Sequence, residues 1–300
     1  MVDVIYFIRS HVQRDHLDQK CCDWIEQYYK KTKNHRSGVN HKKRRKKLIV
    51  SFTTIPSRLD TVWITIESLF RQSYQADRII LWVADEIDYH DICKRLAPQI
   101  ERGLEIRQCS NLGPHKKYFY AFQEFPNDLV VTVDDDVIYS EKMLEGLVKN
   151  YVKNPSRVYC YRSHRIQFKK DGTIKPYARW QGYDERNLTG VCESKLNFFT
   201  GAGGVLYPAR LMPKELFDAD LIAQCCWRAD DVWLYMHMLK NNIPICNVNG
   251  NCGNILVVER SQKEALWKTN LKKQENDEYI AAVGKAMGFT IEDLIGAVKE

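Results

Sequence analysis

Three consecutive aspartates, Asp134, Asp135 and Asp136, follow directly after an apolar run at residues 129–133. If the backbone stays extended, Asp134 and Asp136 point to one side and Asp135 to the other. Two carboxylates a few ångströms apart repel each other, and a hard divalent cation relieves that repulsion while it keeps coordination positions open for phosphate oxygens. We therefore predict that Asp134 and Asp136 bind Mg²⁺ or Mn²⁺ together with a diphosphate. The alternative is a solvated acidic turn before a helix that Ser140 would cap.

A second acidic pair, Asp230 and Asp231, opens an aromatic-rich segment with helical spacing. A carboxylate there can act as a general base toward a hydroxyl, or stabilise positive charge at a carbon under attack. The alternative is structural, because acids favour the first turn of any helix. We predict a catalytic role, chiefly because a glycine-rich loop lies upstream at residues 201–204.

That loop, Gly201-Ala202-Gly203-Gly204, would let a ligand approach the backbone closely. Its spacing matches neither a dinucleotide-binding pattern nor a P-loop. The alternative is a tight crossing of strands or a bulge. Three aromatic residues in this half offer a platform on which a sugar ring can stack, or belong to the core: Trp180, Tyr183 and Trp233.

Basic residues lie at two places where a phosphate group can bind. His115, Lys116 and Lys117 follow Gly113-Pro114 at a predicted helix start, where backbone N–H groups and a lysine favour phosphate. Arg58 is placed similarly after the first predicted strand. Each of these cations alone is more typical of a surface residue than of a ligand, so the prediction depends on their meeting at one place.

The order of elements predicts that meeting. Apolar runs at 48–52, 78–83, 104–107 and 129–133 read as strands, and residues 59–70, 90–102 and 116–124 between them have helical spacing. This alternation is typical of an α/β fold with a mostly parallel, Rossmann-like central sheet flanked by helices. Ligands bind at the carboxyl ends of such strands. Four polar clusters therefore should converge there: residues 53–58, 85–86, 111–117 and 134–136.

The remaining elements frame this core. We expect a helix at 141–152, a hairpin at 164–177, and helices at 229–239, 277–287 and 291–298. Residues 1–29 suggest one or two amphipathic helices. We divide the chain into an N-terminal helical appendage with a basic linker (1–47) and a single catalytic domain (48–300).

Composition narrows the function classes. The 300 residues are 44% hydrophobic and 28% charged, which suits a globular protein without a membrane span or a cleaved signal peptide. Ten cysteines without zinc spacing suggest reduced thiols in a cytoplasmic protein. The net charge of +7 is concentrated in residues 30–47, which contain no acid. Such a segment can be a solvated linker, bind the anionic face of a membrane, or bind nucleic acid.

Taken in order, these motifs resemble GT-A-fold bacterial glycosyltransferases of polysaccharide and lipopolysaccharide (lipooligosaccharide) biosynthesis, of the family 2 type. The resemblance rests on the ordered set of residues 51–58, 65–69, 80–82, 133–139, 201–208 and 229–233. It implies a nucleotide-sugar donor of the UDP-sugar class, and Mn²⁺ or Mg²⁺ as cofactor. The D-x-D element falls on Asp134 and Asp136, and Asp231 would be the general base beside Asp230.

The resemblance also assigns the other site residues. The donor would be bound by Thr54, Pro56, Arg58, Asp85, Lys117, Asp134 and Asp135, with Asp85 near the uridine. The acceptor would be bound by Gly203, Gly204, Trp180 and Trp233. A third metal ligand has no clear match, with Asn276, Asp277 and His237 as candidates. Stereochemistry stays open, because exostosin-type retaining transferases carry a similar triplet, glycine-rich loop and late acidic pair.

We therefore expect a metal-dependent glycosyltransferase that acts on a hydroxyl of a glycan or lipid-linked acceptor. It would work in the cytoplasm, in peripheral contact with the inner face of the plasma membrane through the basic segment, and without nucleic acid. One rival is a nucleotidyltransferase acting on sugar phosphates, which should carry a glycine-rich basic loop at residues 53–58. The other is a nucleic-acid-binding protein that uses residues 30–47.

Overall fold

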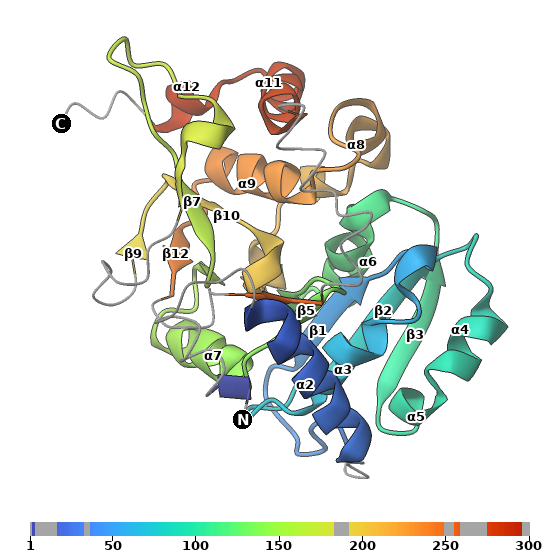
Figure 1. The fold of residues 1–300 in the computed structure, drawn as a ribbon. Helices are drawn as coiled ribbons and strands as arrows, with labels where there is room; N and C mark the ends of the chain where they lie inside the picture. Colours follow the sequence, from blue (N-terminus) through green and yellow to red (C-terminus); the bar gives the residue numbers. More distant parts are fainter. Residues whose placement is uncertain are drawn as a thin grey trace.

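The computed structural model describes residues 2–3, 17–32, 37–182, 192–248, 255–258 and 275–295. Strands and helices alternate through the first half of the chain, as expected (Figure 1). The parallel strands are β1 (Leu48–Thr53), β2 (Arg78–Ala84), β3 (Leu104–Cys109) and β4 (Leu129–Thr132). The connecting helices are α3 (Val62–Phe70), α4 (Tyr89–Arg95), α5 (Ala97–Ile100) and α6 (Lys116–Glu124).

The central sheet has the strand order β3-β2-β1-β4-β11-β6-β12-β9. Its second half consists of β11 (Val205–Pro208), β6 (Val158–Cys160), β12 (Ile245–Asn247) and β9 (Cys192–Glu193). Strand β11 runs antiparallel to β4, with Val205 opposite Thr132. The residues just before β11 therefore lie beside those just after β4, which brings the glycine-rich loop next to the aspartate triplet.

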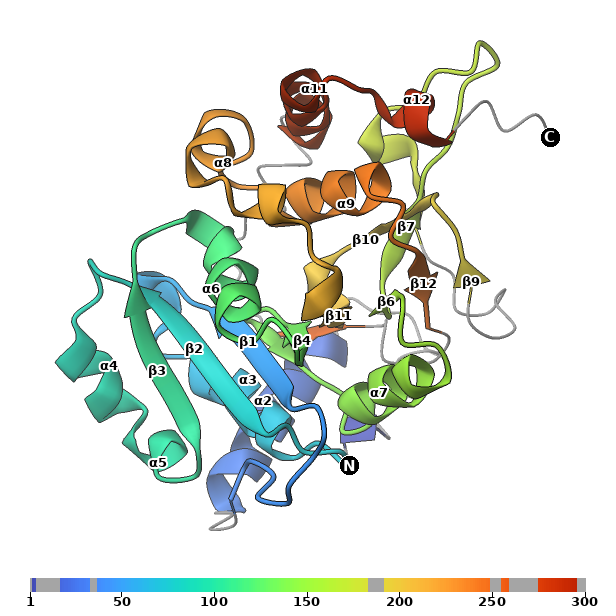
Figure 2. The same cartoon turned by 180° about the vertical axis from the view of Figure 1, so that it is seen from behind.

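Two apolar layers cover the two faces of the sheet, because neighbouring strand residues point to opposite sides. Ile49 and Val130 pack into one layer with α6 and α9 (Asp230–Lys240), whereas Val50 and Val131 pack into the other with α3 and α7 (Met143–Lys153). Figure 2 shows α9 with α8 (Ala219–Cys225), α11 (Glu275–Met287) and α12 (Ile291–Ile295) above the sheet. The predicted α/β architecture with a mostly parallel sheet is confirmed.

Smaller elements complete the second half. A three-stranded sheet has the order β10 (Asn197–Phe199), β7 (Ser163–Arg165), β8 (Gln181–Gly182). The predicted hairpin turn is present at Gly172, whose φ is +85°, but its arms share one isolated bridge, between Phe168 and Ile174. Short 3-10 turns lie at Pro56–Arg58, Gly113–His115, Tyr177–Arg179, Gly201–Gly203, Ala209–Leu211 and Lys214–Phe217.

Two of the differences between expected and observed helix boundaries have identifiable causes. The helix expected at 90–102 is split into α4 and α5 at Leu96, because Pro98 occupies the first turn of α5. Ser140 does not cap α7, which begins at Met143 after Lys142. The Ser140 hydroxyl instead donates to Asp3 Oδ1 at 2.5 Å, a partner 137 residues away that no local pattern indicates.

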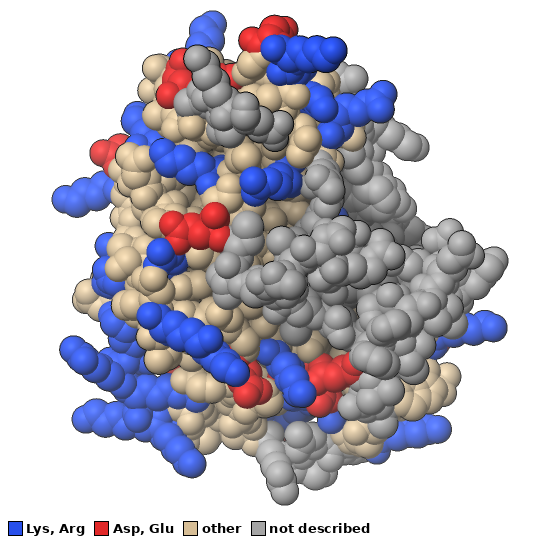
Figure 3. All heavy atoms as spheres, turned by 90° about the vertical axis from the view of Figure 1, so that its left-hand side faces the viewer, with Lys and Arg blue, Asp and Glu red and all other residues tan. Residues whose placement is uncertain are grey.

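The basic segment is not a disordered linker over its described residues, 37–47. The Arg44 guanidinium donates to Asp77 at 3.0 Å and lies over the Tyr74 ring, and Lys46 donates to the Asn127 carbonyl. Asp77 and Asn127 precede β2 and β4, so the segment crosses the amino ends of the strands. Lys and Arg side chains are also spread over the α7 side of the molecule (Figure 3), so positive charge is not confined to this segment.

The N-terminal helix α2 (Leu17–Lys31) packs beside a two-stranded sheet of β5 (Val137–Ile138) and β13 (Leu256–Val257). It lies in front of α3 in Figure 1. Among the described residues, no helix has both the length and the apolar character needed to cross a bilayer.

Candidate functional site

The backbone of the aspartate triplet is fixed by three hydrogen bonds, two of them to residues distant in the sequence. The Asp134 amide donates to the Tyr139 hydroxyl at 2.8 Å, Thr65 Oγ1 donates to the Asp135 carbonyl at 2.9 Å, and the Val258 amide donates to the Asp136 carbonyl at 2.7 Å. Strand β4 ends at Thr132, and residues 135–136 form a turn. The extended backbone assumed for the same-side pair is therefore wrong at this point: Asp135 and Asp136 both contact Arg58, whereas Asp134 contacts Lys117.

Asp135 points inward and organises Arg58. Its carboxylate accepts from Thr54 Oγ1 at 2.6 Å and from Arg58 Nη1 at 2.5 Å, while Arg58 Nη2 lies 3.1 Å from Asp136 Oδ2. Burial raises the pKa of Asp135, against the lowering effect of the Arg58 guanidinium. Thr54 and Arg58 thus reach the triplet as expected, but Asp135 has both oxygens engaged by protein and would have to release one of them to bind a donor.

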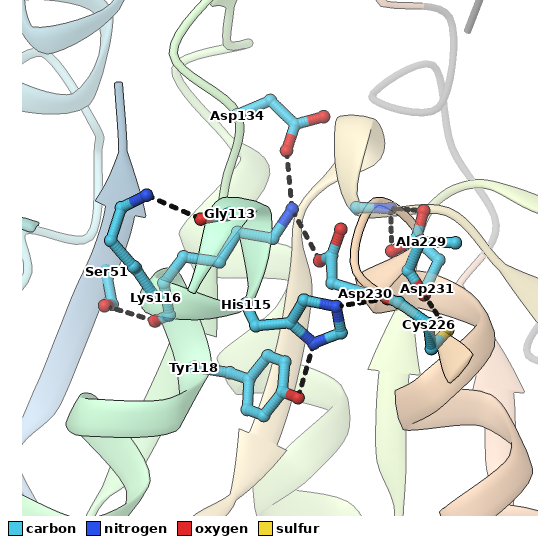
Figure 4. A network of polar contacts seen from close by, with 12 residues as sticks. Ser51, Gly113, His115, Lys116, Tyr118, Asp134, Cys226, Ala229, Asp230 and Asp231 are labelled. Carbon is cyan, nitrogen blue, oxygen red and sulfur yellow. Dashed lines mark hydrogen bonds and ion pairs between the residues drawn. The ribbon is translucent and has the colours of Figure 1, made fainter. Parts of the chain in front are cut away.

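Lys117 joins the triplet to the second acidic pair. Its buried ammonium lies 2.9 Å from Asp134 Oδ1 and 2.8 Å from Asp230 Oδ2 (Figure 4). The Ser51 hydroxyl on β1 donates to the Lys117 carbonyl and fixes the start of α6. Because one amine contacts both carboxylates, the ends of β4 and α9 lie within a few ångströms of each other. Lys117 therefore connects the predicted metal-binding aspartates with the predicted catalytic pair, Asp230 and Asp231.

Asp231 lies beside this bridge and faces the glycine-rich loop. Its two oxygens accept from the Gly201 amide at 3.0 and 3.1 Å. Burial, together with the negative charge of Asp230, raises the pKa of Asp231 to about 8. Asp230 itself is buried against Lys117. Of the pair, Asp231 is therefore the less buried residue, and its raised pKa suits a general acid or base.

The glycines of the loop serve two purposes. A Cβ on Gly201 would lie 3.0 Å from Lys117 Nζ, 3.3 Å from Asp231 Oδ1 and 3.4 Å from Asp134 Oδ1, so this glycine makes room for the site. Gly203 packs against the Arg162 backbone, and Gly204 has a φ of +84°. The packing of Gly203 and the φ of Gly204 thus fit the structural alternative, a tight crossing of strands. We had expected these two glycines to bind the acceptor.

Replacing Gly201 with alanine tests this close approach. The new methyl group should displace the Lys117 ammonium and lower kcat/KM by about 10²-fold, because a misplacement near 1 Å has that cost. The matched control is Gly172→Ala at the hairpin turn, where nothing lies within 4 Å of the added carbon but φ is +85°. That variant should lose thermal stability and keep its activity. Equal activity in both variants would contradict the role of Gly201.

The expected aromatic platform is wrong for the two tryptophans. Trp233 is fully buried and its indole N–H donates to the Leu216 carbonyl at 3.0 Å. Trp180 is 6% exposed and donates to the Lys175 carbonyl at 2.8 Å. Both rings belong to the core and are covered by protein, while Tyr183 lies outside the described residues. Sequence reasoning missed another aromatic residue near the site, Tyr177. Its ring is half-buried and packs on Trp180, and burial and the nearby charge of Asp231 raise the pKa of its hydroxyl.

Two further donor residues lie at the same edge without touching the triplet. Pro56 opens the turn after β1, and Asp85 follows β2, and both side chains are exposed. Asn111 donates to Glu86 at 3.3 Å, which ties the loops after β2 and β3 together.

The predicted convergence of the four polar clusters at the carboxyl ends is confirmed. Of the three basic residues after Pro114, however, only Lys117 reaches the aspartates.

His115 and Lys116 have structural contacts instead. Lys116 Nζ donates to the Gly113 carbonyl at 2.7 Å and to Asn111 at 3.0 Å. His115 is buried between the Tyr118 hydroxyl at 2.8 Å and the Cys226 carbonyl at 2.7 Å, and so links the start of α6 to the segment before α9. Burial lowers the pKa of His115 to about 3. His115 is therefore a neutral residue that holds the two halves of the site together.

Acid should consequently destabilise the protein. The folded-state pKa of His115 lies below the unfolded value of about 6.5, so the unfolded chain binds the proton first. The contribution of neutral His115 to the free energy of unfolding is complete above the unfolded pKa of about 6.5. It is lost as the pH falls toward 3, at up to about 1.4 kcal/mol per pH unit. Urea unfolding between about pH 4 and 7 measures this slope. His115→Gln should flatten it, whereas replacement of the exposed His41 should not.

The donor set fits a hard divalent cation. Five carboxyl groups at this edge, Asp134, Asp135, Asp136, Asp230 and Asp231, face two cationic side chains, Arg58 and Lys117. No group of three or more metal-binding side chains is assembled within the described ranges. Mg²⁺-type sites use one or two carboxylates and complete the shell with water and substrate phosphates, so Asp134 and Asp136 would be enough protein ligands for such an ion. Of the candidates for a third ligand, His237 is buried in α9 and packs on Trp233 with neither ring nitrogen hydrogen-bonded, and Asp277 accepts from the Tyr177 amide.

Comparison with known proteins supports the expected class. The family described as "Glycosyl transferase family 2" matches residues 52–209. No curated protein sequence matches the chain significantly. Among solved structures, GalNAc-T7 with UDP, GalNAc and Mn²⁺ is similar, with a TM-score of 0.52 at 11% identity, over 71% of this chain and 46% of that one. This likeness supports the GT-A fold, and the chain spans less than half of that relative.

Two other solved structures are more distant. Glucosyl-3-phosphoglycerate synthase from Mycobacterium tuberculosis has a TM-score of 0.49 at 11% identity, with 82% of this chain and 81% of that chain covered. A 4-diphosphocytidyl-2C-methyl-D-erythritol synthase has a TM-score of 0.44 at 12% identity, with 78% and 99% covered.

Proposed function

Because the chain belongs to glycosyl transferase family 2, we propose that it transfers a sugar from a nucleoside diphosphate, with UDP as the carrier, to a hydroxyl of a glycan or glycolipid in cell-surface polysaccharide synthesis. The observation that carries this proposal is the Lys117 bridge between Asp134 and Asp230. It brings the side where a diphosphate would leave next to the side where a hydroxyl would attack.

The donor end of the proposed site lies at the ends of β1 and β4. Asp134 and Asp136 would hold Mn²⁺ or Mg²⁺, which neutralises the charge that develops on a departing diphosphate. Arg58 and Lys117 already pair with these carboxylates and are placed to pair with phosphate oxygens when a donor binds. Pro56 and Asp85, exposed at the same edge, would line the nucleotide pocket.

At the acceptor end, Asp231 would take the proton of the attacking hydroxyl. The Gly201 amide holds its carboxyl group in place, and the Lys117 ammonium beside Asp230 opposes the rise that burial causes in the pKa of Asp230. A general base has to be ionised to accept a proton, so the raised pKa of Asp231 has a direct consequence for the pH dependence of the rate.

We expect kcat/KM to rise with pH and to level off above about 8, the pKa of the Asp231 carboxyl. An aspartate with an ordinary pKa near 4 would instead give a flat profile above pH 6. Initial rates in a buffer series at constant Mn²⁺ and ionic strength measure this. A flat profile between about pH 6 and pH 9 would exclude Asp231 as the titrating base.

Membrane contact through the basic segment would constrain the acceptor. The exposed side chains of Lys42, Lys43, Arg45 and Lys47 lie at the amino ends of the strands, where the Lys47 amide donates to Asp128. Asp134 lies six residues further along, about 20 Å at 3.3 Å per strand residue. A bilayer bound there would face away from the catalytic edge, so the acceptor hydroxyl would have to be on a chain that extends well beyond the lipid headgroups.

A hydrolysis and transfer assay with UDP-sugars and Mn²⁺ tests the proposal directly. We expect metal-dependent release of UDP that is lost in Asp136→Ala. If no nucleotide-sugar is turned over, or if that variant keeps full activity, the proposal is wrong. Release of pyrophosphate from a nucleoside triphosphate and a sugar phosphate would favour the nucleotidyltransferase alternative.

A further inference from the structure

The N-terminal helix α2 buries one face against the segment that follows the aspartate triplet. Ile25 is fully buried, and Cys22 and Tyr29 are 6% and 4% exposed. They share an apolar cluster with Ile64 of α3, Ile138 of β5, and Leu256 and Val258 at β13. On the opposite side of the helix, Trp24 is 47% exposed. The helix is thus packed into the catalytic domain and is not a separate appendage at this point.

Two hydrogen bonds connect this helix to Asp136. The Cys22 thiol donates to the Val257 carbonyl on β13 at 3.0 Å. The next residue, Val258, donates its amide to the Asp136 carbonyl at 2.7 Å. Strand β13 also pairs with β5, which begins directly after Asp136. Helix α2 therefore supports the strand that fixes the position of Asp136.

The far end of the same segment is held by the first residues of the chain. Asp3 Oδ1 accepts from the Ser140 hydroxyl at 2.5 Å and from the Glu141 amide at 3.0 Å, and Val2 is buried in the same cluster as Ile25. Between these anchors, the buried Tyr139 extends its hydroxyl to the Asp134 amide. Residues 136–141 are thus held at one end by β13, which α2 supports, and at the other end by Asp3, and Tyr139 links this segment to Asp134.

We propose that residues 2–3 and α2 are a positioning element of the catalytic domain, which fixes the turn at residues 135–136 and so sets where the Asp136 carboxylate lies. The physical reason is that β5 and β13 pair over only two residues each, and a ribbon of that size is not stable alone. Burial of Ile25 and Cys22 against it supplies the missing support. The inference rests on the proposed role of Asp136 as a metal ligand.

The test compares two substitutions on the two faces of α2, in the full-length chain. Ile25→Ala removes buried side-chain atoms above β5 and β13, and Trp24→Ala is the matched control on the exposed face. Amide hydrogen exchange without metal should rise by about tenfold or more at residues 137–138 and 258 in Ile25→Ala, because the local opening free energy falls. Exchange in β1 and β2 should stay unchanged, and Trp24→Ala should behave as the unmodified protein.

The second measurement is Mn²⁺ binding to the apoprotein by electron paramagnetic resonance. The Kd should rise by a similar factor in Ile25→Ala and not in Trp24→Ala. Unchanged exchange at residues 137–138, or an unchanged Kd beside a lowered Tm, overturns the proposal. If Ile25→Ala does not fold, Cys22→Ala, which removes the thiol donor with little change in volume, decides by the same criteria. If the unmodified protein binds no Mn²⁺, the metal function fails, while the exchange result still decides whether α2 holds this turn.

Discussion

Replacing Asp231 with asparagine should lower kcat by about 10²–10⁴-fold, the usual loss when a general base is removed. Asparagine keeps the size of the side chain and an oxygen that can accept from the Gly201 amide at the observed 3.0 Å, so the loop should stay in place. Only the ability to take a proton is lost. Binding of Mn²⁺ and of the donor should therefore be largely unchanged, since Asp231 contacts the Gly201 amide, whereas Arg58 and Lys117 contact the triplet.

The matched control removes the same charge from a nearby helix start. Asp220 lies exposed in the first turn of α8, and Asp220→Asn should leave kcat unchanged. Steady-state kinetics, with donor affinity from calorimetry, separate the two outcomes. If Asp231→Asn retains more than about a tenth of the activity, another group accepts the proton and the assignment of the base is wrong.

Replacing Asp134 with alanine should abolish metal-dependent activity and weaken Mn²⁺ binding by at least about 10²-fold, more than the loss typical of residues that only support a ligand. Asp134 is the most exposed carboxylate of the triplet, 30% against 5% for Asp135 and 13% for Asp136. Its removal also leaves Lys117 paired with Asp230 alone. Calorimetric titration with Mn²⁺ and initial rates across a metal series measure both effects.

Asp128 provides the control for this substitution, because it lies at the amino end of the same strand, β4. Its carboxylate accepts from the Lys47 amide at 2.9 Å, so Asp128→Ala should lower Tm and keep Mn²⁺ binding. Metal affinity that falls equally in both variants would show a general loss of structure. Unchanged Mn²⁺ affinity in Asp134→Ala would place the metal elsewhere.

The sequence predicted the sheet edge well because the relevant signals are local. Continuous runs such as 48–52 and 129–133 are buried on both faces, and parallel strands put their carboxyl ends together whatever the details of the loops. For this reason Arg58, Lys117 and the triplet were expected at one place, and they lie there. The pairing of Lys117 with Asp230, 113 residues apart, depends on how α9 docks and has no local signature.

The errors have physical causes of the same kind. Alternation in a strand predicted Asp134 and Asp136 on one side, but Thr65 and Val258 hold a turn there from distant parts of the chain. From its residue type and spacing, Trp233 could equally be part of the core or a platform for a sugar ring. The hydrogen bond from its indole N–H to the Leu216 carbonyl shows that it belongs to the core. The contacts of residues 2–3 and α2 could not be predicted from the sequence either, since Asp3 and Cys22 form hydrogen bonds with partners 137 and 235 residues away.

The most direct measurement of the central claim is thermal unfolding with a panel of nucleotide-sugars, each with and without Mn²⁺. A ligand that binds the folded state stabilises it by about 2.7 kcal/mol at one hundred times its Kd. We predict that at least one UDP-sugar raises Tm with Mn²⁺, has little effect without it, and has none on Asp136→Ala. A panel in which no nucleotide-sugar raises Tm with Mn²⁺, or one in which Asp136→Ala responds as the unmodified protein does, would contradict a metal–diphosphate site at the aspartate triplet.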